Sequence, residues 1–199
     1  MQNALISQKA ASAAKARPPL ERGRKKNIAA FGFATSERDY VPCLFLPSLN
    51  NKSRQLIIYF HGNGEDLGTI YTVCDHLRTA LNLNLLAVEY PDYGIYEDPE
   101  GPSEEKILSD AELVYNFVQD VVKLKEKDIF VMGRSLGSGP STHLAAKFNP
   151  GCLILVSPYT SIKSVASDKV GFLSHLLAQQ FDNLSKMHSV TCPTFILHG

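Results

Sequence analysis

The residue types most suited to chemistry in this chain lie at Gly133-Arg134-Ser135-Leu136-Gly137, which has the form G-x-S-x-G. The motif follows an apolar, β-branched run at residues 129–132 and precedes a helical stretch. A serine at such a strand-to-helix turn presents its hydroxyl as a nucleophile, and glycines two residues away on either side relieve the crowding of its backbone. The motif therefore predicts a nucleophilic Ser135 supported by Gly133 and Gly137; the alternative is a packing turn of small residues.

Acyl transfer by a serine also needs a base for its proton and N–H donors for the developing oxyanion. The backbone N–H of Leu136, directly after the nucleophile and at the positive end of a helix, is the expected first donor. The second donor should come from the loop after an earlier strand, and His61-Gly62-Asn63-Gly64 fits because its glycines let an amide approach the substrate. We expect that donor to be the N–H of Asn63, with Gly64 as the fallback. The alternative is a loop that only starts the next helix, with Asp66 as its N-cap.

The elements that position these motifs alternate along the chain. Apolar runs at 56–60, 85–88, 129–132, 153–156 and 194–197 predict buried strands, and 40–46 is expected to pair antiparallel with the stretch near Phe31. Helical stretches lie between them, the last at about 165–187. This order predicts right-handed crossovers and an α/β fold, a mostly parallel sheet with helices on both faces. Ligands bind such sheets at the carboxyl ends of the strands, where both motifs lie.

Two of the helices have a clear pattern. The more distinct one has Ser103 as a plausible N-cap and then apolar residues at helical spacing: Ile107, Ala111, Val114, Val118 and Val121. The other is expected to carry Ile70, Cys74, Leu77 and Leu81 on one face.

Composition indicates one soluble globular domain at 29–199, because 44% of the 199 residues are apolar and 20% are charged. The net charge of zero gives no argument for nucleic acid. Residues 1–28 form a basic arm, with seven Lys or Arg against Glu21 alone, a net +6 that leaves −6 for the remainder. The arm is interpreted as a disordered, solvated tail; a contact with a membrane surface and an organelle presequence are the alternatives.

The compartment is expected to be reducing and cytoplasmic, with at most a peripheral contact to membranes. No run reaches the ~18 apolar residues that a membrane span needs, and no signal-peptide core precedes residue 28. The cysteines are widely separated and read as buried thiols, with no metal-ligand spacing: Cys43, Cys74, Cys152 and Cys192. No metal and no organic cofactor is expected, and the sequence does not indicate an oligomeric state.

Five motifs together resemble the α/β-hydrolase superfamily, over residues 31–199. They are the stretches 61–68 (HGNGEDLG), 89–94 (EYPDYG), 133–141 (GRSLGSGPS), 157–161 (SPYTS) and 196–199 (ILHG). The branch they resemble is the intracellular hydrolases that include protein depalmitoylases, although the clustered amino-terminal cysteines of those enzymes are absent from residues 1–42. The resemblance implies a triad in chain order Ser, Asp, His, with the acid and the histidine after Gly199.

These observations lead to an expectation and an alternative. The chain is expected to be the amino-terminal part of a serine hydrolase, carboxy-terminally incomplete and lacking the last strand and helix, so that strand 194–197 forms an exposed apolar edge. Its substrate is expected to be an ester or thioester, with S-acylated protein the leading choice and residues 160–187 setting acyl preference. The alternative is an inactive chain that binds acyl groups or a partner. None of the histidines is favoured as the base: His61 is expected to brace its own loop and His143 to point away from Ser135.

Overall fold

The computed structural model describes residues 29–34, 40–50, 52–160 and 181–198, and the basic arm lies outside them. The described residues form a seven-stranded sheet in the order β1-β2-β4-β3-β5-β6-β7. The strands are β1 (Ala29–Ala34), β2 (Tyr40–Leu46), β3 (Leu56–Phe60), β4 (Asn84–Val88), β5 (Ile129–Arg134), β6 (Cys152–Val156) and β7 (Thr194–Leu197). β2 runs antiparallel to β1 and β4, and all other pairs are parallel. The α/β architecture expected from the sequence is confirmed.

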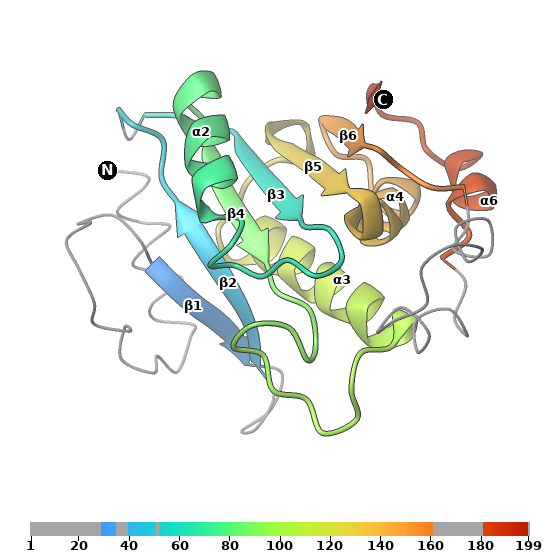
Figure 1. Ribbon diagram of the computed structural model, residues 1–199. Helices are drawn as coiled ribbons and strands as arrows, with labels where there is room; N and C mark the ends of the chain where they lie inside the picture. The colour runs from blue at the N-terminus through green and yellow to red at the C-terminus, as the bar shows by residue number, and fades with distance from the viewer. Residues whose placement is uncertain (1–28, 35–39, 51, 161–180, 199) are drawn as a thin grey trace.

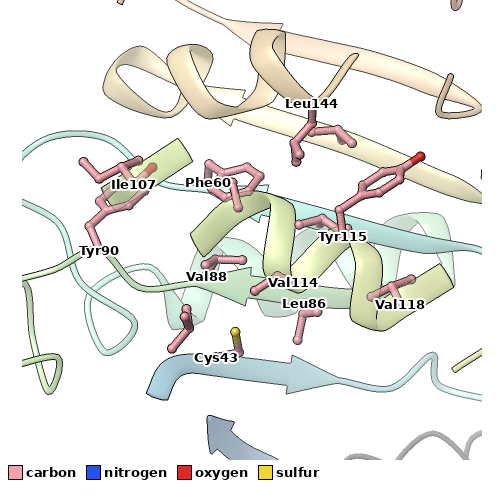
Figure 2. Packing of buried hydrophobic residues seen from close by; sticks show 14 of the residues in the cluster. Cys43, Phe60, Leu86, Val88, Tyr90, Ile107, Val114, Tyr115, Val118 and Leu144 are labelled. Atoms are coloured by element: carbon pink, nitrogen blue, oxygen red, sulfur yellow. The ribbon is translucent and has the colours of Figure 1, made fainter. Parts of the chain in front are cut away.

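Helices cover both faces of this sheet, as Figure 1 shows. α2 (Tyr71–Leu81) packs on one face, and α3 (Glu104–Asp120) and α4 (Ser138–Lys147) pack on the other. β3 is buried on both sides because its residues alternate. Leu56, Ile58 and Phe60 join the α3–α4 core, whereas Ile57 and Tyr59 join the α2 core. Figure 2 shows Phe60 within the α3–α4 core. This alternation explains why the buried strands read as continuous apolar runs.

The helix boundaries match the sequence patterns closely at α3 and less closely at α2. Ser103 caps α3, because its side chain accepts a hydrogen bond from the Lys106 N–H. Val121 follows the last turn and is 38% exposed, so the expected apolar face stops at Val118. α2 begins only at Tyr71, and Asp66 caps the turn before it rather than the helix. Leu81, expected on the buried face, is 51% exposed because it lies at the end of the helix.

The carboxy-terminal elements are α6 (Asn183–Met187) and β7, which lies at the edge of the sheet beside β6. Most of the helical stretch expected at 165–187 lies outside the described residues. As expected, the apolar side chains of β7 are exposed, each by more than half: Phe195, Ile196 and Leu197. Within the described part of the chain, no helix has the length and apolar character needed to cross a bilayer.

The register of the central strands brings the two candidate motifs to one level of the sheet. Phe60, the last residue of β3, pairs with Gly133 of β5 on one side and with Val88 of β4 on the other. Because these strands are parallel, the loops that follow them leave the sheet at the same edge. The serine motif, the loop at 61–66 and the loop after β4 therefore meet.

Candidate functional site

Ser135 lies at the turn between β5 and α4, directly after the last residue of the strand. A 3₁₀ turn (Ser135–Gly137) connects it to the helix, and the backbone φ of Ser135 is +49°. A positive φ is uncommon in a residue with a side chain, and strain of this kind costs about 1–3 kcal/mol. The turn is therefore as sharp as the G-x-S-x-G pattern predicted.

The two flanking glycines have no room for a side chain. A Cβ on Gly133 would lie 2.1 Å from the Gly137 carbonyl oxygen and 2.4 Å from Ser141 Oγ. A Cβ on Gly137 would lie 2.1 Å from the Phe60 carbonyl oxygen and 2.9 Å from that of His61. Gly137 thus lets the start of the helix touch the end of β3, and this contact places the loop at 61–66 beside Ser135.

The peptide between Ser135 and Leu136 is held through its carbonyl group. Ser138 Oγ donates to the Ser135 carbonyl oxygen over 2.7 Å and in turn accepts from Asn183 Nδ2 over 3.1 Å. In a trans peptide the N–H points opposite to the C=O. Fixing the Ser135 carbonyl therefore fixes the direction of the Leu136 N–H, which lies among the helix-start amides that lack partners within the helix.

The Leu136 carbonyl is also bound, by the hydroxyl of Tyr159 in the loop after β6, over 3.3 Å. Burial raises the pKa of Tyr159 well above its ordinary value, so the phenol stays protonated and can donate. The loops after β5 and β6 are joined by this bond.

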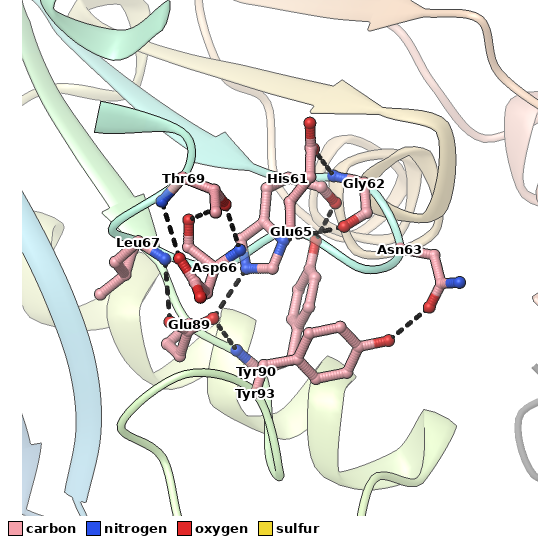
Figure 3. Close-up of polar contacts among 10 residues, drawn as sticks. All are labelled: His61, Gly62, Asn63, Glu65, Asp66, Leu67, Thr69, Glu89, Tyr90 and Tyr93. Carbon is pink, nitrogen blue, oxygen red and sulfur yellow. Dashed lines mark hydrogen bonds and ion pairs between the residues drawn. The ribbon is translucent and has the colours of Figure 1, made fainter. Parts of the chain in front are cut away.

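The facing loop is braced by a buried histidine and glutamate, neither more than 1% exposed. His61 Nδ1 donates to the Gly62 carbonyl over 3.0 Å, and its Nε2 lies 2.8 Å from Glu89 Oε1 (Figure 3). The other Glu89 oxygen accepts from the Leu67 N–H over 3.0 Å. His61 thus braces its own loop. Because the Gly62 carbonyl is held, the Asn63 N–H points the opposite way.

Asn63 is anchored by the loop that follows β4. The Tyr93 hydroxyl donates to Asn63 Oδ1 over 2.6 Å, and the Tyr90 hydroxyl donates to the His61 carbonyl over 2.8 Å. Burial raises the pKa of Tyr93 to about 12, which keeps it a donor at neutral pH. The rings of the two tyrosines pack edge to face, with their centroids 5.5 Å apart. Gly64, the fallback donor, has φ +73° and is exposed, as Asn63 is.

The remaining histidines and acids in the described residues have other surroundings. His143 Nε2 lies 2.7 Å from Glu112 on α3, so it points away from Ser135, as expected. Three histidines are exposed (His76, His188 and His198), and His175 lies outside the described residues. Asp92 occupies a turn at φ +66°. No group of three or more potential metal ligands occurs in the part of the chain that is described.

Sequence reasoning missed four residues that hold the site: Glu89, Tyr93, Ser138 and Asn183. A signal existed only for Glu89, an acidic residue directly after a fully buried strand, because a buried carboxylate needs a partner. Ser138 and Tyr93 are ordinary helix-start and loop residues by type. Tyr93 acts through Asn63, 30 positions away, and Ser138 is itself held by Asn183, 45 positions away, although its bond to the Ser135 carbonyl spans only three residues.

Comparisons with known proteins identify relatives along most of this chain. No family model matches the chain. It is 27% identical over 175 residues to human alpha/beta hydrolase domain-containing protein 17B, covering 88% of this chain and 59% of the relative. It is 29% identical to the Caenorhabditis elegans alpha/beta hydrolase domain-containing protein aho-3, covering 83% of this chain and 48% of the relative. The chain thus spans about three fifths or less of the length of these two relatives.

Solved structures share the fold at lower identity. An alpha-beta hydrolase from Vibrio vulnificus superimposes with a TM-score of 0.68 at 17% identity, covering 87% of this chain and 64% of that one. A Pyrococcus furiosus esterase gives a TM-score of 0.62 at 16% identity, covering 91% and 74%. At these identities the likeness concerns the fold.

Proposed function

Since the chain belongs to the α/β-hydrolase superfamily, we propose that its protein is a serine hydrolase that cleaves a carboxylic ester or thioester. Ser135 is the proposed nucleophile, and the backbone N–H groups of Leu136 and Asn63 are the proposed oxyanion donors. The proposal includes a histidine base and its acid, which the resemblance puts after β7 in chain order. None of the described residues is assigned to either role.

The proposed reaction proceeds in two steps. The base takes the Ser135 proton as Oγ bonds to the carbonyl carbon, and the carbonyl oxygen becomes an anion that two N–H donors stabilise. As the intermediate collapses, the carbon–sulfur or carbon–oxygen bond breaks, the base protonates the leaving thiol or alcohol, and an acyl-serine remains. Water, deprotonated by the same base, attacks the acyl-serine and releases a carboxylic acid and the free hydroxyl.

The observation that carries the proposal is the backbone of Ser135. A positive φ at a serine between a buried strand and a helix stores strain, and strained non-glycine residues gather at functional sites. Other turns of the described chain, such as that at Asp92, also have a positive φ, so the support comes from this backbone together with Gly133 and Gly137, neither of which has room for a side chain. The two held carbonyl groups, at Ser135 and Gly62, add support because each leaves an N–H directed away from its anchor.

S-acylated protein is the proposed substrate class, by resemblance to the depalmitoylase branch. The loop and turn geometry alone serves esterases and thioesterases equally. The segment expected to set acyl preference, residues 160–187, lies largely outside the described residues.

Covalent labelling tests the nucleophile. An alkyl fluorophosphonate should label the full-length protein at Ser135, and Ser135→Ala should abolish both labelling and hydrolysis of a p-nitrophenyl ester. Ser185→Ala is the matched control, since Ser185 lies on α6 and its Oγ donates to the carbonyl of Asp182, three residues before it, over 3.3 Å. Labelling that persists in Ser135→Ala would refute the assignment. If the protein hydrolyses an S-palmitoyl peptide at a higher rate than the corresponding oxygen ester, this would support a thioester as the substrate.

A further inference from the structure

An ion pair joins the two segments that carry the proposed oxyanion donors. Arg134, directly before Ser135, donates through Nη1 to Glu65 Oε1 in the facing loop. The second carboxylate oxygen, Oε2, accepts from the Gly62 N–H over 2.7 Å. A single carboxylate thus contacts the start of the loop at 61–66 and also the end of β5, where Arg134 lies 69 positions from Glu65 in the chain.

The backbone around Gly62 is packed against both members of the pair. A Cβ on Gly62 would lie 3.0 Å from Glu65 Oε2 and 3.3 Å from Arg134 Nη1. The N–H of Gly62 is held by Glu65 and its carbonyl by His61, so the two peptides on either side of this residue are fixed. The second of these peptides carries the Asn63 N–H. The position of that N–H relative to Ser135 therefore depends on the Glu65–Arg134 contact.

We propose that Arg134 and Glu65 are positioning residues that set the separation of the two oxyanion donors, an inference that rests on the proposed function. Donors aimed at an oxyanion act on the transition state, where the charge develops, more than on the bound substrate. Weakening the pair therefore lowers kcat and leaves KM nearly unchanged. Removing one donor completely costs roughly 100-fold or more in rate. A displaced donor costs less, and we expect a loss of about tenfold.

The partial exposure of the pair separates this role from a purely structural one. Arg134 is 49% exposed and Glu65 28%. A partly exposed pair of this kind contributes little to stability and is weakened by salt. Its loss should therefore barely change the melting temperature, whereas the rate should fall.

The test uses four variants of the full-length protein: Glu65→Gln, Arg134→Gln, their combination and Arg134→Lys. Gln at 65 keeps an oxygen for the Gly62 N–H but loses the charge, and Lys at 134 keeps the charge. Lys147→Gln is the matched control, since Lys147 is 51% exposed and pairs with Glu112 over 2.7 Å, far along α4 from Ser135. The readouts are kcat and KM for an uncharged p-nitrophenyl ester at low and high salt, together with thermal unfolding.

We expect each Gln variant to lose kcat about tenfold with KM within twofold, and the double variant to lose no more than either single one. Arg134→Lys should recover part of the loss, and salt should lower kcat of the unmodified protein but not of the Gln variants. Additive losses, a raised KM at constant kcat, or an equal loss in Lys147→Gln would each overturn the positioning role. Full activity in the Gln variants with an inactive Ser135→Ala refutes this inference alone; an active Ser135→Ala refutes the proposed function and this inference together.

Discussion

Replacing Gly137 by alanine tests whether contact between the helix start and β3 sets the site. The added Cβ would meet three backbone atoms: the Phe60 carbonyl oxygen at 2.1 Å, its carbon at 2.6 Å and the His61 carbonyl oxygen at 2.9 Å. Carbon atoms prefer separations of about 3.5–4.0 Å from their neighbours. Neither partner is a flexible side chain, so the two backbones must move apart by roughly 1 Å.

That movement acts directly on the proposed catalytic geometry. The Phe60–His61 backbone leads straight into the loop with Asn63, whereas Gly137 follows Leu136, so both proposed donors are displaced relative to one another. A misplacement of about 1 Å can cost roughly 100-fold in rate, which corresponds to about 2.7 kcal/mol in activation free energy. Overpacking itself should cost about 1–3 kcal/mol in stability.

The measurement pairs kcat for a p-nitrophenyl ester with the free energy of unfolding by urea, followed by circular dichroism. Gly68→Ala is the control, because its Cβ would meet only a flexible side chain, Asp66 Oδ1 at 3.2 Å. We expect Gly137→Ala to remain folded at 20 °C yet lose roughly 100-fold in kcat, and Gly68→Ala to keep its rate. A folded Gly137→Ala with kcat within twofold of the unmodified protein would refute the reasoning.

Two further predictions concern single hydrogen bonds. Ser138→Ala removes the donor to the Ser135 carbonyl and the acceptor for Asn183 Nδ2, so it should cost about 1–3 kcal/mol in urea unfolding and lower kcat more than KM changes; an unaltered kcat would show that the carbonyl needs no side-chain anchor. Asp66→Ala should cost about 1 kcal/mol at pH 7, because Asp66 Oδ1 accepts from the Thr69 N–H over 2.7 Å and this bond holds the carboxyl pKa below its ordinary value of 3.8. A carboxylate whose pKa is lower in the folded than in the unfolded protein stabilises the fold above pH 3.8, and this contribution is lost as pH falls through the folded pKa. The difference in unfolding free energy between Asp66→Ala and the unmodified protein should therefore shrink below pH 3.8. A difference that grows there would contradict the prediction.

The fold could be predicted because burial on two faces leaves a local mark on the sequence. The residues of β3 are apolar at every position since alternate side chains enter different cores, and the same is true of most of β4. Ser103 could be assigned because capping is a contact over three residues. The predictions that Leu81 and Val121 would be buried were wrong, because periodicity does not reveal where the end of a helix extends past the sheet.

The candidate site was predictable only to the extent that its constraints are local. Gly133 and Gly137 indicate a crowded turn because both lie within five residues of sequence. The glycines of the loop at 61–64 indicate a place where a backbone amide can approach a substrate. By type and position, Asp92 is interpreted as a turn residue and Glu65 as a helix-start residue. Asp92 does lie in a turn. Glu65 differs because its partner, Arg134, lies 69 residues away, and charge alone does not indicate which of many arginines a glutamate meets.

The same hydrogen bonds serve folding and the proposed chemistry, and this follows from the geometry of the peptide group. A carbonyl at a sharp turn beside a packed core is costly unless it is bound. In this chain Ser138 binds the Ser135 carbonyl and His61 binds that of Gly62. Because each peptide is trans, satisfying the buried oxygen turns the N–H outward. On the proposed function, the two donors are thereby held before substrate arrives, so that an oxyanion would be stabilised without reorganisation of the backbone. Variants that weaken either anchor should consequently lose stability and rate together, whereas loss of the exposed Arg134–Glu65 pair should affect the rate far more than the stability.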